Sequence, residues 1–110
     1  MTCASDTQGS TILDGLAHNR TLEILNLERN ELGSKTAKKI AAIIAKNGKL
    51  TKLNLRLNMI SDEDAKSIIE SLNKNKKLIL LNLEYNKIKA EIQNILEDIS
   101  KSKKGLEIKI

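Results

Sequence analysis

The sequence contains no phenylalanine, tryptophan, valine or proline, and Tyr85 is its only aromatic residue. The core of a 110-residue chain must therefore be filled by leucine and isoleucine, which suffice for one domain. A single cysteine, Cys3, excludes an intramolecular disulfide and a thiolate metal cluster. No apolar run approaches the ~18 residues of a membrane span, and the first twenty residues lack the features of a signal peptide. We therefore expect a single domain in a reducing compartment, the cytoplasm.

Three segments, 22–32, 50–60 and 78–88, align without gaps and follow one another at a constant 28-residue spacing. Each fits the pattern L-x-x-L-x-L-x-x-N-x-[LI], which is the leucine-rich-repeat signature. Leucines at alternate positions predict a short parallel strand with one buried face. The asparagine that follows predicts a turn in which its amide bonds backbone groups of the adjacent turn. This structural role is assigned to Asn30, Asn58 and Asn86.

After each strand the apolar spacing changes to that of one helix face. In the third unit this face follows its counterpart in the second at a 27-residue spacing, which predicts that one residue is lost between the strand and the helix. These helix-face residues are Ala65, Ile68, Ile69 and Leu72 in the second unit, and Ile92, Ile95, Leu96 and Ile99 in the third.

The domain is expected to begin with a half repeat and to end on a fourth strand. Reading backwards by one repeat length gives a first helix with Ile12, Leu13, Leu16 and Ala17 on its buried face, and Ile108 and Ile110 point inward from the last strand. Neither end shows a polar cap, so self-association through the ends, or a place in a longer array, is expected. The predicted organisation is a disordered leader 1–5, a half repeat 6–21, repeats 22–49, 50–77 and 78–104, and a terminal strand 105–110, with 6–110 as one domain.

The 28-residue unit resembles the ribonuclease-inhibitor-like class of leucine-rich-repeat proteins, which includes tropomodulin and the arrays of NOD-like receptors. The resemblance implies an α/β fold: a curved right-handed solenoid with parallel strands on the concave side and α-helices on the convex side. It implies protein binding in general and names no partner, because members share a scaffold and differ in what they bind. Together with the composition, which is rich in lysine, isoleucine and asparagine, it also allows a host-directed effector, delivered to a host cytoplasm.

No residue set in the sequence predicts catalysis, a metal site or a cofactor. His18, the only histidine, has no neighbouring cysteine or carboxylate at ligand or triad spacing, and Cys3 has no basic neighbour to activate it. The acidic run 62–64 could coordinate a cation, but a position in the first turn of a helix explains it through the helix dipole. We therefore predict that the protein is not an enzyme.

Outward positions of the strands form columns across the concave face, and these columns carry the predicted partner-binding site. One column of asparagines could form an amide ladder, which we favour, or offer hydrogen bonds to a partner. Another alternates glutamate and arginine, which favours pairing between strands. Bulky apolar groups beside an arginine and a tyrosine are typical of interface anchors, although the same groups could merely cover the end of a short array. The predicted partner-binding residues are Ile24, Arg29, Lys52, Arg56, Leu57, Leu80, Glu84 and Tyr85.

The chain carries 19 lysines and arginines against 14 acids, a formal charge of +5. Nine of these bases fall at or just after predicted helix ends, where a cation complements the helix dipole. The predicted function is a non-catalytic protein–protein interaction module that uses the concave face, within a larger receptor or effector in one interpretation. The alternative is a basic-edge adaptor for nucleic acid or an acidic membrane. The edge residues are Arg20, Lys46, Lys49, Lys74, Lys76, Lys77, Lys101, Lys103 and Lys104.

Overall fold

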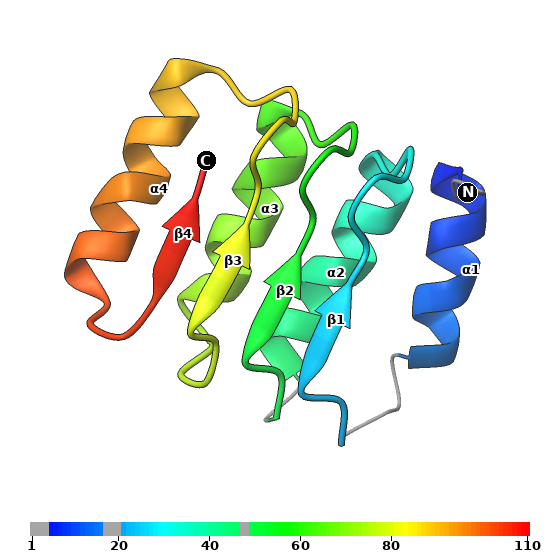
Figure 1. Ribbon diagram of the computed structural model, residues 1–110, viewed down its shortest axis with the longest axis horizontal. Coiled ribbons are helices and arrows are strands. Elements are labelled where there is room, and N and C mark those ends of the chain that lie inside the picture. Colours follow the sequence, from blue (N-terminus) through cyan, green and yellow to red (C-terminus); the bar gives the residue numbers. More distant parts are fainter. Residues whose placement is uncertain (1–4, 17–20, 47–48) are drawn as a thin grey trace.

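Four parallel strands alternate with four helices along the chain, as a computed structural model shows for residues 5–16, 21–46 and 49–110 (Figure 1). The strands lie in one sheet in the order β1-β2-β3-β4, so each strand pairs with the next one in sequence. The helices pack on one face of this sheet and leave the other face open (Figure 1). The predicted α/β leucine-rich solenoid is confirmed. The elements are α1 (Asp6–Leu16), β1 (Ile24–Asn26), α2 (Ser34–Lys46), β2 (Lys52–Asn54), α3 (Asp62–Leu72), β3 (Leu80–Asn82), α4 (Ala90–Ser102) and β4 (Glu107–Lys109).

The core lies between the sheet and the helices and consists of aliphatic side chains. Leu53 and Leu55 of the second repeat are at most 1% exposed, as are Ile60 and Ile68, which pack from the turn and the helix. Full burial of one such side chain contributes roughly 1.5–3 kcal/mol. A repeat can therefore be stable without an aromatic residue when its neighbours cover both sides.

Asn58 and Asn86 each join their own repeat to the preceding one. The Asn58 amide donates to the carbonyl of Leu27 at 2.9 Å and to that of Leu55 at 3.1 Å, and its Oδ1 accepts the backbone N–H of Leu32 at 3.1 Å. Asn86 repeats the arrangement one repeat later, and its side-chain amide donates a hydrogen bond of 2.9 Å to the Leu55 carbonyl. Because Asn58 is only 5% exposed, these bonds satisfy backbone groups that water cannot reach.

Helix starts are capped in two different ways. Ser61 and Asp64 form a capping box at α3, in which each side chain bonds the backbone N–H of the other. The start of α2 is instead capped from the preceding repeat by Asp6, whose carboxylate accepts the backbone N–H groups of Gly33, Lys35 and Thr36. The helices are thus tied to their neighbours at their N-termini as well as through the core.

The phase of α4 differs from the prediction. Leu96, one full 28-residue repeat after Ile68, is fully buried, whereas Ile95, assigned to the buried face by the 27-residue spacing, is 45% exposed. The shorter spacing appears only at β4, where Ile108 pairs with Leu81. The lost residue therefore lies between the helix and the strand that follows it, not before the helix.

The two ends of the solenoid are only partly covered. Ile12 on α1 is 48% exposed although the sequence places it on a buried face, while Leu13 beside it is fully buried. Ile108 and Ile110 are half-buried at the other end. Ser5, assigned to the disordered leader, belongs to the fold, since it bridges to Glu31. Ala17, Arg20, His18 and Cys3 lie outside the described residues.

Candidate interaction surface

The open face of the sheet carries three rows of side chains that run across the strands. Strand register aligns Ile24, Lys52 and Leu80 at the strand starts, which we call the start row. The next outward positions form the amide row, and the positions after those form the charged row. The amide row is Asn26, Asn54 and Asn82, and the charged row is Glu28, Arg56 and Glu84.

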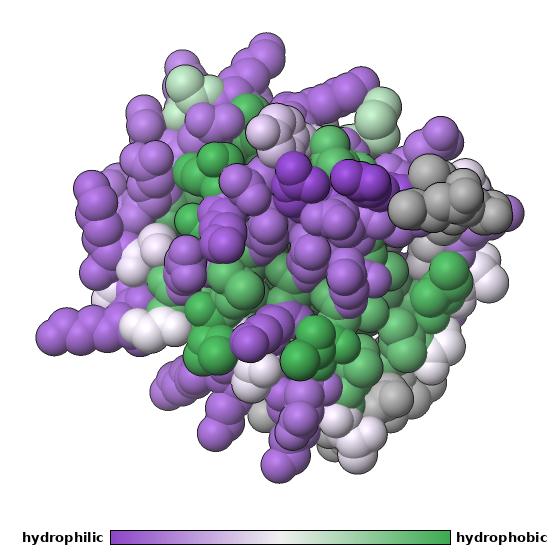
Figure 2. Space-filling view, in the orientation of Figure 1, coloured by the Kyte–Doolittle hydropathy of each residue, from purple (hydrophilic) through white to green (hydrophobic). Residues whose placement is uncertain are grey.

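The start row and the amide row together line a hollow of about 170 Å³. Ile24 is 59% exposed beside it, Leu80 is half-buried and Lys52 is exposed. Small-molecule sites usually occupy roughly 300–1,000 Å³, so this hollow is closer in size to a partner's side chain than to a cofactor. Figure 2 shows that hydrophobic surface on this face gathers toward the strand starts, whereas hydrophilic side chains cover the region where the strands end.

The amide row does not form the predicted ladder. Each of its three Oδ1 atoms accepts the backbone N–H of the residue two positions later, at 3.0 Å in every case. In the part of the chain that the structure describes, no hydrogen bond joins one of these amides to another. The local hydrogen bond is favoured over a bond between asparagines because it satisfies a backbone N–H at the point where the strand ends.

The charged row is held together by Arg56. Its Nη1 lies 3.3 Å from Oε1 of Glu28, and its Nε lies 3.8 Å from Oε1 of Glu84. The guanidinium carbon also lies 4.8 Å from the ring centroid of Tyr85, which is 67% exposed. Partly exposed contacts of these kinds contribute about 0.5–1 kcal/mol each. Arg56 therefore fixes the position of Tyr85 at the rim of the face.

The residues before the turn asparagines adopt the left-handed backbone conformation. The φ angles of Arg29, Leu57 and Tyr85 are 61°, 60° and 56°. A non-glycine residue in this region costs roughly 1–2 kcal/mol, which the bonds of the adjacent asparagine offset. This geometry turns Arg29 and Tyr85 into solvent, while Leu57 stays half-buried.

The predicted patch of Leu57, Leu80, Arg56 and Tyr85 is divided in two by the structure. Leu80 belongs to the start row, whereas the other three lie beyond the opposite ends of the strands. The amide row lies between them. Ile24 and Lys52 thus group with Leu80, while Arg29 stays at the turns and Glu84 bonds Arg56.

Comparison with known proteins identifies the family from which this arrangement comes. A leucine-rich-repeat family model matches residues 18–41 and 46–68. The chain is a leucine-rich-repeat protein. Its structure is also similar to one titled leiomodin-1 actin-binding site 2, with a TM-score of 0.81 at 19% sequence identity. The similarity covers 96% of this chain but 62% of that one, so the chain spans less than two thirds of the similar structure. A search of curated proteins finds no match.

In this leucine-rich-repeat protein, lysines gather at the edge where helices end and strands begin. Lys103 has a clear structural role, since its Nζ donates to the carbonyls of Leu72 at 2.6 Å and Asn75 at 3.0 Å. Beside it lies a hollow of about 220 Å³ that Lys76 and Lys104 also line. The bonds of Lys103 agree with the helix-dipole explanation of the edge, and the adaptor hypothesis stays a prediction.

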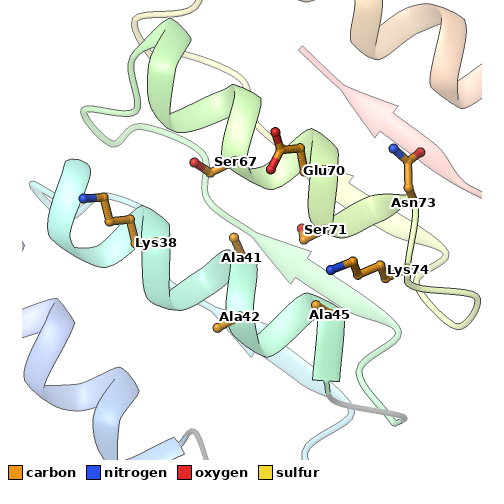
Figure 3. Close-up of a pocket in the computed structure, with 9 residues that line it drawn as sticks. All are labelled: Lys38, Ala41, Ala42, Ala45, Ser67, Glu70, Ser71, Asn73 and Lys74. Carbon is orange, nitrogen blue, oxygen red and sulfur yellow. The ribbon is translucent and has the colours of Figure 1, made fainter.

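A wider groove lies on the convex side, between α2 and α3 (Figure 3). It has a volume of about 540 Å³, and short side chains of the two helices, among them Ala41 and Ser71, face one another across it. Lys38 and Glu70 lie at its borders. Small side chains let neighbouring helices of a repeat protein approach closely, so the packing of the repeats accounts for this groove.

The acidic run 62–64 serves the helix starts. Asp64 belongs to the α3 capping box, Asp62 accepts the backbone N–H of Lys89 at 2.8 Å, and Glu63 pairs with Lys66. Within residues 5–16, 21–46 and 49–110, no group of three histidine, cysteine, aspartate or glutamate side chains is placed to hold a metal ion. Nor is any helix in these ranges long and apolar enough to cross a membrane.

Proposed function

We propose that the chain is a protein-interaction module that binds its partner through the open face of the sheet. The observation that carries the proposal is the hollow between the start row and the amide row, with Ile24 59% exposed beside it. A large aliphatic side chain left in water on a rigid face gains free energy when a partner covers it.

The rim of the face supplies a second anchor of the kind that interfaces use. Tyrosine and arginine are enriched among the residues that dominate binding energy. Tyr85 is held over Arg56 before any partner arrives, so little side-chain freedom is lost on binding. The similar structure is titled an actin-binding site, which supports a protein as the class of partner and does not extend to its identity.

Affinity capture with matched variants tests the proposal. The immobilised wild-type chain is compared with Ile24→Asp combined with Tyr85→Ala, and with Ile95→Asp as a control on the convex side, where that isoleucine is similarly exposed. We expect proteins that bind the wild type and the control to be depleted at least tenfold on the double variant, as quantified by mass spectrometry. Circular dichroism checks that all three chains are folded. Retention of every captured protein by the double variant would contradict the proposal.

A further inference from the structure

We propose that the open face binds the carboxylates of an acidic protein segment, with the amide row and Lys52 as the hydrogen-bond donors. The inference rests on the interaction function proposed above and specifies the chemistry of the partner. It is derived from the atoms that the start row and the amide row expose to solvent.

The amide row turns hydrogen-bond donors toward the open side of the sheet. The Oδ1 atoms of Asn26, Asn54 and Asn82 are each engaged by a backbone N–H at 3.0 Å, which fixes the orientation of the amide and leaves the NH₂ group on the open side. Among the described residues, none of these three NH₂ groups donates to another protein atom. Parallel strands are about 4.8 Å apart, so the sheet carries a regular line of unused donors.

Lys52 adds a positive charge to the same hollow. It stands in register between Ile24 and Leu80, and no described carboxylate forms an ion pair with it. The side chains that line the hollow include no acid. Glu107 is in register with Leu80 on the last strand but does not line the hollow. A ligand that accepts hydrogen bonds and carries negative charge complements this surface.

The surroundings select where such a ligand lies. Glu28 and Glu84 are at the far side of the face, where they would repel an acidic segment even though Arg56 pairs with both. The lysine edge adjoins the start row, because the strands begin there, and its field attracts negative charge toward that side. The exposed aliphatic groups of Ile24 and Leu80 favour a segment in which acidic residues alternate with aliphatic ones.

A nucleic acid fits the same hollow less well. Bases bound as single strands stack on aromatic side chains, and the only aromatic residue, Tyr85, lies at the opposite rim. Ile24 and Leu80 would gain nothing from a phosphate backbone. A protein segment uses both the donors and the aliphatic groups.

The test titrates the ¹⁵N-labelled protein with two twelve-residue peptides and follows its NMR signals. One peptide alternates Glu, Leu and Ser, and its twin carries Gln in place of every Glu. We expect the Glu peptide to shift the side-chain NH₂ signals of Asn26, Asn54 and Asn82, and the Gln peptide to bind at least tenfold more weakly. Affinity for the Glu peptide should fall as salt is raised.

Two pairs of variants sharpen the test. Asn54→Asp keeps an oxygen that can accept the Arg56 N–H and replaces the outward donor with an acceptor, so we expect at least tenfold weaker binding of the Glu peptide. Asn94→Asp makes the same chemical change at an exposed position of α4 and should leave the affinity unchanged. Lys52→Glu reverses the charge in the hollow and should likewise weaken binding of the Glu peptide. Lys38→Glu makes the same change on the convex side and should leave the affinity unchanged.

The outcomes separate this inference from the function on which it rests. Equal affinity for the two peptides overturns carboxylate recognition while leaving a protein-binding face. Shifts confined to the loops of the lysine edge overturn the choice of surface, and tighter binding of a single-stranded oligonucleotide at the amide row overturns the choice of partner. Failure of both peptides to bind at millimolar concentration overturns the inference, whereas the capture experiment decides the interaction function independently.

Discussion

Asp6 lies in the first turn of α1 but acts on the helix of the next repeat. Burial of its carboxylate raises its pKa, but hydrogen bonds from Gly33, from both the side chain and the backbone of Thr36, and from Lys35 outweigh that effect and lower the pKa from 3.8 to about 2. The folded protein therefore favours the charged carboxylate. Stability from this group is present above the unfolded pKa and is lost as the pH falls toward 2.

Asp6→Asn should remove this contribution. Because a pKa shift of one unit corresponds to about 1.4 kcal/mol and Asp6 is partly exposed, we expect the variant to be about 1–2 kcal/mol less stable than the wild type at pH 6. The difference should shrink as the pH falls from 4 to 2. Urea unfolding of both proteins across this range measures it, and comparing them cancels the titration of other carboxylates. A difference that stays constant down to pH 2 would contradict the assignment.

Single residues differ in how well the sequence predicts them. The turn asparagines recur at the 28-residue spacing, so their position in a stack, and hence bonds to the neighbouring repeat, can be predicted from the sequence. The cap formed by Asp6 was harder to predict. Asp62 accepts the Lys89 N–H at the same 27-residue spacing that separates Asp6 from Gly33, but Ser34 holds the equivalent position of the repeat between them, so the sequence shows no regular pattern. The left-handed turns at Arg29 and Leu57 were also missed, since neither residue type favours that conformation.

Helix α4 shows how an element can be placed correctly and phased incorrectly. Ile95, Leu96 and Ile99 are all aliphatic, so the 27-residue and the 28-residue spacing both give an apolar face. The structure selects the longer spacing, because the turn asparagine and the start of the helix keep the period of the earlier repeats. The strand that follows starts one residue early instead.

The phase of α4 predicts unequal costs for two neighbouring substitutions. Leu96→Ala removes a fully buried side chain, and we expect it to lower the free energy of unfolding by about 2–5 kcal/mol. Ile95→Ala removes a side chain that is 45% exposed and should cost less than about 1 kcal/mol. Chemical denaturation of the two variants measures both. If both variants lost the same free energy of unfolding, or Ile95→Ala lost more, the result would support the 27-residue spacing for α4.

The strands also explain why the residues of the predicted patch lie in two separate places. Leu80 and Tyr85 are close in sequence, and an alignment of the repeats alone treats them as neighbours on one surface. A strand separates them by its length, and the left-handed turn then directs Tyr85 to the rim. The pairing of Ile24 with Leu80 through Lys52 depends on strand register, which the 28-residue spacing predicts.

At the scale of the whole molecule, each of the two outermost helices exposes an isoleucine to solvent. Ile12 on α1 is 48% exposed and Ile95 on α4 is 45% exposed, and these helices lie at opposite ends of the array (Figure 1). The isolated ends therefore favour contact with another apolar surface.

This exposure predicts association between copies of the chain. Covering one half-exposed isoleucine contributes about 1 kcal/mol, so we expect weak association that grows with concentration. Sedimentation equilibrium of the wild type should show an average mass that rises with concentration, whereas Ile12→Lys combined with Ile95→Lys should stay monomeric. Ile79→Lys, which changes a similarly exposed isoleucine directly before the inner strand β3, is the control. A wild type that is monomeric at every concentration would rule out association through the ends.

The asparagine bonds also determine how the molecule can change in length. Asn58 and Asn86 bond the repeat before them in the same way, so each 28-residue unit meets its neighbours through identical partners. A tandem duplication of residues 50–77 would supply both halves of every such bond and add one strand and one helix. An insertion of another length between a strand and its turn asparagine would move that asparagine away from its carbonyl. Growth of this protein by whole copied units, and not by residue-level insertion, is the route that its hydrogen bonding permits.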